Sequence, residues 1–253
     1  ALHQVSDVRF TRCTLTLRNP DRAPAAFFAV QGASSWDAAG RDEEPMVAST
    51  PKISLDASVV RGQASLVRAT EGVPFRLEWQ QGFLATTECL AEAEGLADFT
   101  LSDVIRISLA HVTAAVDQGL FRLRIHQTAP VLPEVAIRCE NCVFVQSRSV
   151  PLIEYHGVDS VAQATAMFEM DGKDNFYDFT EIRWRIVPTD EMTQDFRWEE
   201  QAQNWYLERR ADRGLRWRNS VPAPYQDVSQ RTPQDYLLDP SDKSRFVDHT
   251  GCG

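Results

Sequence analysis

The chain has 253 residues, a formal net charge of −10 and a pI near 5.0. Hydrophobic residues make up 43% and charged residues 25%, which is ordinary for a globular protein and too apolar for an intrinsically disordered one. Because the acidic balance repels phosphate backbones and anionic membrane surfaces, we expect no nucleic acid as partner. No apolar run approaches the ~20 residues of a membrane span, so we expect no membrane insertion by this chain itself.

An apolar triplet at positions i, i+2 and i+4 occurs five times along the chain. A period of two predicts a strand with one buried face, and its recurrence between polar turns predicts strands that stack in parallel. We expect the central residues of the triplets to form one ladder with all side chains inward. The triplets are Val8-Phe10-Arg12, Ile53-Leu55-Ala57, Phe75-Leu77-Trp79, Ile105-Ile107-Leu109 and Val135-Ile137-Cys139, in which only Arg12 breaks the pattern.

Two shorter apolar stretches follow each triplet, so each repeat holds three short strands. No amphipathic helix separates consecutive strands, as a doubly wound α/β fold would need. This predicts an all-β, right-handed parallel β-helix of the pectin-lyase-like kind, a solenoid of stacked coils over residues 1–188. Asn141 suits the left-handed backbone of a corner, residues 34–50 read as a loop expelled from one coil, and residues 168–170 and 182–186 start further coils.

Past Pro188 the pattern changes, and residues 189–253 are expected to form a helix and an extended tail packed on the solenoid. Residues 193–210 contain no Gly or Pro, and Trp198, Ala202 and Trp205 at i, i+4 and i+7 predict an amphipathic helix. Because a solenoid end exposes its core and unpaired strand edges, we expect Trp198 and Trp205 to dock this helix there. The alternative is a helix with exposed tryptophans that binds a partner.

Six stretches cover most of the chain: ISLDASVVRGQASLVRATEG (53–72), FRLEWQQGFLATTECL (75–90), IRISLAHVTAAVDQGLFRL (105–123), IRCENCVFVQSRSVPLIEYHGVDS (137–160), DGKDNFYDF (171–179) and TPQDYLLDPSDKS (232–244). Read in order, they resemble the β-helix region C-terminal to the kinase domain of some bacterial serine/threonine protein kinases. The resemblance implies a parallel β-helix in the extracytoplasmic or appended part of a membrane-anchored signalling protein, and no catalytic residues. The kinase motifs G-x-G-x-x-G, H-R-D and D-F-G do not occur in this sequence.

Outward side chains of stacked strands are expected to form columns. The expected columns place Asp56 beside Glu78, about 5 Å apart at the backbone, with Arg76, Arg106 and Arg138 nearby. Polysaccharide lyases and hydrolases built on β-helices use such strips, because a carboxylate pair can divide the acid and base roles. The alternative is a solvated ladder of cross-strand ion pairs, which alternating charges explain equally well.

Cysteine and histidine offer little chemistry. An odd number of irregularly spaced cysteines argues against a disulfide framework. Cys139-x-x-Cys142 could be half of a zinc site, but no second ligand pair occurs, so we expect both to be buried thiols that bind no metal. The five histidines are scattered, and none lies near a serine or cysteine in a nucleophile motif.

Residues 171–178 (DGKDNFYD) are dense in oxygen ligands, and Asp171, Asp174 and Asp178 could hold calcium. The stretch does not match the twelve-residue EF-hand loop, so a plain Asx-rich turn with the two aromatic residues packed inward is favoured. Trp36, in the expelled loop, could be a sugar-stacking platform or could fold back on the coil.

The sequence therefore predicts a non-enzymatic binding, sensor or scaffold domain of a kinase-type signalling protein, with no cofactor. The expected partner is a glycan, a cell-envelope component or another protein. The alternative is a polysaccharide lyase or hydrolase that uses Asp56 and Glu78 on the outer face of the β-helix.

Overall fold

The computed structural model describes residues 6–21, 23–31, 50–95, 104–125, 133–146, 150–178, 182–197, 205–206, 228, 230 and 232–236. These residues are mostly β-strand and form two largely parallel sheets, so the fold is all-β. Within the same ranges, helix is confined to α1 (Val161–Ala166) and the 3-10 turn η3 (Pro233–Tyr236). None of the described helices is long and apolar enough to cross a membrane.

The described strands form a ten-stranded sheet A and a seven-stranded sheet B. Sheet A runs β1 (Asp7–Thr11), β4 (Lys52–Gly62), β6 (Arg76–Thr86), β8 (Val104–Val116), β10 (Glu134–Glu140), β13 (Phe168–Lys173) and β17 (Trp205–Tyr206), with β2 (Thr14–Leu17) on β4, β11 (Val143–Gln146) on β8, and β14 (Phe176–Asp178) on β11. Sheet B runs β3 (Ala26–Val30), β5 (Ser65–Ala69), β7 (Ala91–Gly95), β9 (Phe121–Ile125), β12 (Ile153–Val158), β15 (Ile182–Pro188) and β16 (Gln194–Arg197).

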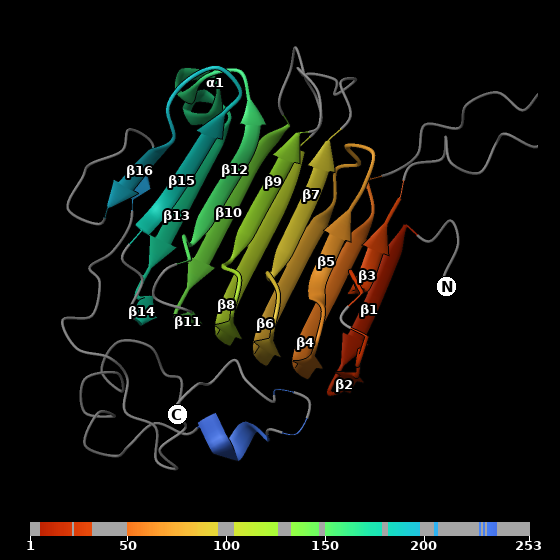
Figure 1. Ribbon diagram of the computed structural model, residues 1–253. Helices are drawn as coiled ribbons and strands as arrows, with labels where there is room; N and C mark the ends of the chain where they lie inside the picture. The colour runs from red at the N-terminus through yellow and green to blue at the C-terminus, as the bar shows by residue number, and fades with distance from the viewer. Residues whose placement is uncertain are drawn as a thin grey trace, which may run out of the picture.

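The chain alternates between the two sheets, and each pass adds strands beside those of the pass before (Figure 1). The described pairings are parallel except that between β15 and β16. The strands that begin at residues 168 and 182, β13 and β15, confirm that the repeat continues past Cys142. Strand order in space therefore follows strand order in sequence.

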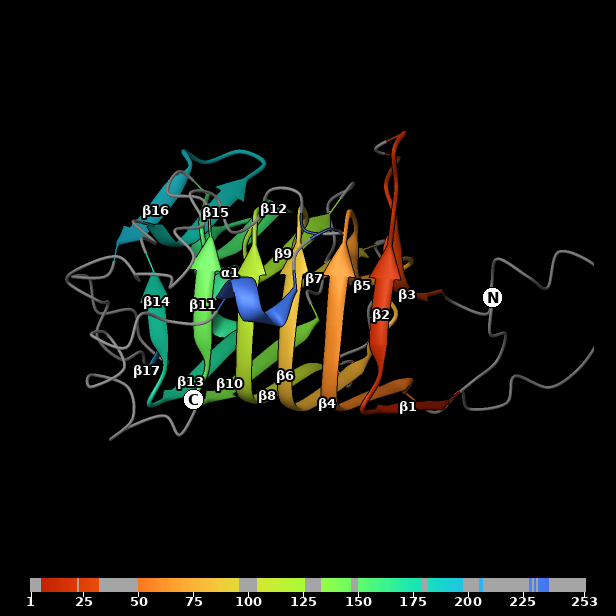
Figure 2. The ribbon, with the colours of Figure 1, turned by 90° about the horizontal axis from the view of Figure 1, so that it is seen from below.

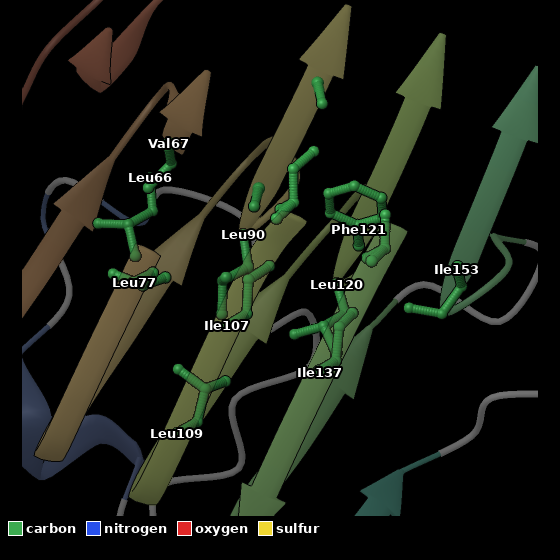
Figure 3. Packing of buried hydrophobic residues seen from close by; sticks show 14 of the residues in the cluster. Leu66, Val67, Leu77, Leu90, Ile107, Leu109, Leu120, Phe121, Ile137 and Ile153 are labelled. Atoms are coloured by element: carbon green, nitrogen blue, oxygen red, sulfur yellow. The ribbon is translucent and has the colours of Figure 1, made fainter. Parts of the chain in front are cut away.

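Inward side chains of both sheets form one continuous apolar core (Figure 3). In β6, exposed and buried residues alternate from Arg76 to Trp79, as a strand with one buried face requires. Leu77, Ile107 and Ile137 from sheet A are buried with Phe121 of sheet B in this core. The period-two triplets therefore mark the core side of sheet A.

One residue with positive φ bends each pass of sheet A at the same place and divides the sheet into a first half and a second half. A non-glycine residue in this conformation costs roughly 1–2 kcal/mol, so six recurrences show that the flanking strands impose the bend. The corner residues are Arg12 (φ 54°), Ala57 (46°), Gln81 (52°), His111 (56°), Asn141 (53°) and Asp174 (54°). The prediction of a left-handed corner at Asn141 is confirmed.

The predicted ladder of triplet centres is correct between β1 and β4 and again from β6 to β10. Phe10 pairs with Leu55, and Leu77, Ile107 and Ile137 pair in order across β6, β8 and β10. All five belong to parallel strands of sheet A.

The predicted pairing between β4 and β6 is wrong by two residues. Leu55 pairs with Trp79, not with Leu77. The corner sets this register, because the corner residue Ala57 lies beside the corner residue Gln81. The triplet pattern alone does not show where the chain bends, so the register could not be read from it. The same two-residue difference applies to every outward residue of β4, so each of them has a different neighbour on β6 from the predicted one.

The predicted helix over residues 193–210 is wrong wherever the structure describes these residues. Gln194–Arg197 form β16, antiparallel to β15, and Trp205–Tyr206 form β17 beside β13. The edge of β15 offers unpaired N–H and C=O groups, and pairing with them outweighs the helical spacing. Trp198 and the side chain of Trp205 lie outside the described residues, as does the predicted loop apart from Thr50, and with it Trp36.

Strand β16 covers the edge of sheet B that the helix was expected to protect. Arg185 donates two hydrogen bonds to the carboxylate of Asp195, at 2.7 and 2.8 Å. Phe196 stacks on Trp184 with ring centroids 5.6 Å apart. The cover is thus a strand fixed by an ion pair and an aromatic contact.

The outer face of the second half of sheet A is apolar, and a segment near the C-terminus covers part of it. Val228 is fully buried there against Phe83, Val143 and Val145. Figure 2 shows η3 in front of the middle strands of this face. On the described strands of the first half of the same sheet, most outward residues are polar or charged.

Candidate functional site

Twelve outward side chains of β4, β6, β8 and β10, in the three rows nearest the corner, form a surface here called the polar face. Eight of its twelve residues are exposed and the other four are half-buried. Three rows cross the strands in register: Lys52, Arg76, Arg106 and Ala136; Ser54, Glu78, Ser108 and Arg138; Asp56, Gln80, Ala110 and Glu140. The polar face is therefore an open surface whose charged side chains extend from fixed backbone positions.

The structure does not place Asp56 opposite Glu78. Asp56 pairs with Gln80, and Glu78 pairs with Ser54, so the two carboxylates lie on adjacent strands in different rows. Oε2 of Glu78 accepts a hydrogen bond from Nζ of Lys52 at 2.7 Å. The predicted pairing of Asp56 with Glu78 is therefore wrong, because the register differs by two residues from the predicted one. Glu78 instead forms an ion pair with Lys52 on the neighbouring strand.

The three arginines noted in the sequence do lie together on the polar face. Arg76 pairs with Arg106 in the first row, and Arg138 lies between Ser108 of β8 and Asp171 of β13 in the second. All three are exposed, and none makes an ion pair with any residue that the structure describes. They are the cations of this surface that remain available to a ligand.

A second charged surface lies on the outside of sheet B and is here called the charge ladder. Its residues alternate in sign from strand to strand, so each has oppositely charged neighbours. In spatial order the charge ladder contains Arg68, Glu92, Arg122, Glu154, Arg185 and Asp195. Unlike the polar face, its central residues are largely buried.

Glu154 is the best-paired member of the charge ladder. Its Oε2 accepts a hydrogen bond from Nε of Arg122 at 2.8 Å, and its Oε1 lies 3.0 Å from Nε2 of His156. Burial alone would raise the pKa of Glu154, but hydrogen bonds and charges from His156 and Arg122 lower it to about 2. Glu154 therefore stays ionised near neutral pH and cannot act as a proton donor there.

Uncharged polar groups provide further hydrogen bonds to the charged residues in the middle of the charge ladder. The Ser65 hydroxyl donates to Oε1 of Glu92 at 2.5 Å, and the Arg122 guanidinium donates to Oε1 of Gln118 at 3.3 Å. Burial, reinforced by the charge of Glu92, raises the pKa of the neighbouring Glu88 carboxyl. This surface is a paired network that ties successive strands of sheet B together.

Comparisons with known proteins returned no match. No family model, no curated protein and no solved structure matches this chain.

The charge ladder was not predicted from the sequence. Its signal was present in the spacing, because Arg122 follows Glu92 by 30 residues and Glu154 follows Arg122 by 32, close to the repeat length. The sign alternates between repeats rather than within one strand. A search for opposite charges one repeat apart would have found it.

Cys139 and Cys142 are both buried, as predicted, on either side of the corner at Asn141. In the described part of the chain, no three His, Cys, Asp or Glu side chains are grouped to hold a metal ion. That these thiols bind no zinc stays a prediction, and stoichiometric zinc in the purified chain would contradict it.

Residues 171–178 contain the end of β13, the corner at Asp174 and β14, and Asn175 holds this corner in place. Its Oδ1 accepts a hydrogen bond from the backbone N–H of Cys142 at 2.9 Å, and its Nδ2 donates to the carbonyl of Cys139 at 2.8 Å. Asp171 and Asp174 are exposed, and the side chain of Asp178 lies outside the description. The amide therefore joins this corner to the preceding pass. Tyr177 packs in the core as predicted, but Phe176 packs against the outer apolar cluster that contains Val228.

Proposed function

We propose that the chain is a right-handed parallel β-helix that works as a binding domain appended to a kinase-type signalling protein, with a glycan as its partner. The parallel pairing in chain order and the six stacked corners support the β-helix. A crystal structure in which β4, β6, β8 and β10 are not parallel neighbours would overturn it. For the parent protein, the gene should encode a kinase domain upstream of residue 1.

The polar face is the observation that carries the binding role. Its strands are held by in-register hydrogen bonds and a packed core, so binding a ligand requires no ordering of the backbone. Exposed carboxylates, guanidinium groups and hydroxyls are the donors and acceptors that sugar hydroxyls need. A long ligand can lie across several strands without any rearrangement of the backbone.

A glycan array with the purified chain tests this proposal. We expect a defined set of glycans to bind and Ser108→Trp, which puts a bulky side chain at the centre of the polar face, to abolish that binding. Ala162→Trp, at an exposed position of α1, is the matched control and should bind like the parent. Glycan binding that survives Ser108→Trp would contradict the proposed face.

A reducing-sugar release assay on the bound glycans separates binding from cleavage. We expect no release above background. Release that Asp56→Asn abolishes would overturn the binding role and favour the polysaccharide-active enzyme.

A further inference from the structure

The first two passes and the C-terminal segment line a hollow that belongs to neither the polar face nor the charge ladder. Its volume is about 580 Å³. Among the residues that the structure describes, its lining consists of Arg18, Pro20, Arg61, Gln63 and Gln230, and it is here called the arginine pocket. β2 and the second half of β4, which Figure 2 shows on the same side of the molecule as η3, lead into this pocket. The corner of each pass therefore separates it from the polar face.

Hydrogen bonds between the first two passes fix one wall of the arginine pocket. The backbone N–H of Asn19 donates to Oε1 of Gln63 at 2.9 Å, and Nδ2 of Asn19 donates to the Gln63 carbonyl at 3.3 Å. Nε of Arg61 donates to Oγ1 of Thr16 at 3.2 Å. Because Oε1 of Gln63 already accepts a hydrogen bond, the amide nitrogen of Gln63, which donates to no described residue, is the group that remains for a ligand.

The described lining of the arginine pocket carries positive charge and no negative charge. Arg18 is exposed and makes no ion pair with a described residue, and Arg61 is half-buried. Asp21, which follows Pro20 directly, and Asp235, in the same segment as Gln230, do not belong to the lining. Two guanidinium groups beside one hollow repel each other, so an anion bound between them lowers the electrostatic free energy.

The side chains of the arginine pocket select the chemistry of the ligand. Guanidinium groups bind phosphate through two parallel hydrogen bonds. The volume lies within the range of roughly 300–1,000 Å³ for small-molecule sites, so there is room for more than a phosphate group. The amides of Gln63 and Gln230 suit hydroxyl groups, and no described lining residue is an aromatic that would stack on a nucleobase. A sugar that carries a phosphate matches both kinds of group.

We propose that the arginine pocket binds a phosphorylated sugar, with Arg18 and Arg61 on its phosphate and Gln63 and Gln230 on its hydroxyl groups. Gln230 lies two residues after Val228, which is buried where the C-terminal segment packs on sheet A. Because the ligand contacts this segment and the first two passes together, its binding stabilises the packed form of the segment.

Titration calorimetry with glucose 6-phosphate tests the inference, with glucose and inorganic phosphate as comparison ligands. We expect glucose 6-phosphate to bind at least about tenfold more tightly than either, because each of them offers only one of the two kinds of group. Arg18→Gln and Arg61→Gln should each weaken this binding about tenfold. Arg9→Gln removes the same charge from an exposed residue of β1 and should leave the affinity unchanged.

Limited proteolysis gives a second readout that does not depend on the heat of binding. We expect glucose 6-phosphate to slow cleavage of the C-terminal segment and glucose at the same concentration to have no effect. Val228→Asp, which should release this segment, should also weaken the binding of glucose 6-phosphate.

Four results would overturn the phosphorylated sugar. They are no binding of glucose 6-phosphate at millimolar concentration, inorganic phosphate that binds as tightly, an affinity that Arg18→Gln and Arg9→Gln change equally, and cleavage that glucose 6-phosphate does not slow. Because Arg18 is exposed, its variant should melt like the parent even if Arg61→Gln does not. The arginine pocket shares no residue with the polar face, so Ser108→Trp tests the proposed function separately, and either proposal can fail while the other stands.

Discussion

Replacing Glu154 by Gln should destabilise the chain by about 2 kcal/mol at pH 7. Glu154 neutralises Arg122, whose side chain is only 9% exposed. The amide of Gln keeps the shape of the carboxylate and some of its hydrogen bonding but not its charge. The variant therefore leaves a largely buried guanidinium without its oppositely charged partner.

The magnitude follows from the pKa of Glu154. A carboxyl whose pKa is 4.5 when unperturbed and about 2 in the folded chain contributes about 3 kcal/mol of stability when it is ionised. His156, one of the two groups that lower this pKa, has a side chain that is 41% exposed. Solvent screens that contribution, which brings the expected loss down to about 2 kcal/mol.

The pH dependence has a definite sign. Because the pKa of Glu154 is lower in the folded chain than in the unfolded chain, its stabilisation is fully present above pH 4.5 and is lost as the pH falls toward 2. The gap in unfolding free energy between the parent and Glu154→Gln should therefore close over that range. All other carboxylates are the same in the two proteins, so their contributions to the pH dependence of the unfolding free energy cancel in this difference.

Urea unfolding followed by tryptophan fluorescence at pH 7, 5, 4 and 3 measures this gap. Glu140→Gln is the matched control, since Glu140 pairs with Lys173 at 3.0 Å with both side chains at least half exposed. The control should change the free energy of unfolding by no more than about 0.5 kcal/mol. A gap for Glu154→Gln as large at pH 3 as at pH 7 would refute the reasoning.

Three further substitutions probe the packing. Asn175→Ala removes two hydrogen bonds of 2.9 and 2.8 Å to backbone groups and should lower the free energy of unfolding by about 2–4 kcal/mol in urea; a loss below about 1 kcal/mol would mean that water replaces the amide. Gly82→Ala places a Cβ 2.0 Å from Nε1 of Trp79, so we expect a strongly lowered melting temperature, and a melt like that of the parent would disprove the close contact. Val228→Asp puts a charge into an apolar cluster and should make the C-terminal segment sensitive to limited proteolysis, whereas Gln230→Asp at an exposed position should not; equal cleavage of both would contradict the burial of Val228.

The first halves of the sheet A strands could be predicted from the sequence because buried residues alternate there with exposed or half-buried ones. A period of two is visible in a single strand and needs no knowledge of the partner strand. The step from Leu77 to Ile107 to Ile137 then gave the correct register, since these passes have equal lengths. Between Leu55 and Leu77 the pass is shorter, and the register could not be inferred without the bend at Ala57.

The C-terminal region was mispredicted for a different reason. A spacing of i, i+4 and i+7 is a local signal, whereas the conformation of Gln194–Arg197 depends on the free edge of β15.

The candidate site was also predictable only in its local features. The arginines were noted as a group because they recur with the repeat, but the Asp56 and Glu78 pair depended on one register and failed with it.

The corner residues have a consequence for how such a chain can change in length. From Arg12 to Asp174 the steps between corners are 45, 24, 30, 30 and 33 residues, yet every corner stays in register with its neighbours. Extra or missing residues are therefore absorbed elsewhere in the pass and do not displace the strands on either side of the bend. A stretch such as 82–111, which runs from just after one corner to the end of the next, is equivalent to a removable module. Duplication or loss of one such module would add or remove one strand of the polar face. Each row of that face would become one residue longer or shorter, and the other strands would keep their register.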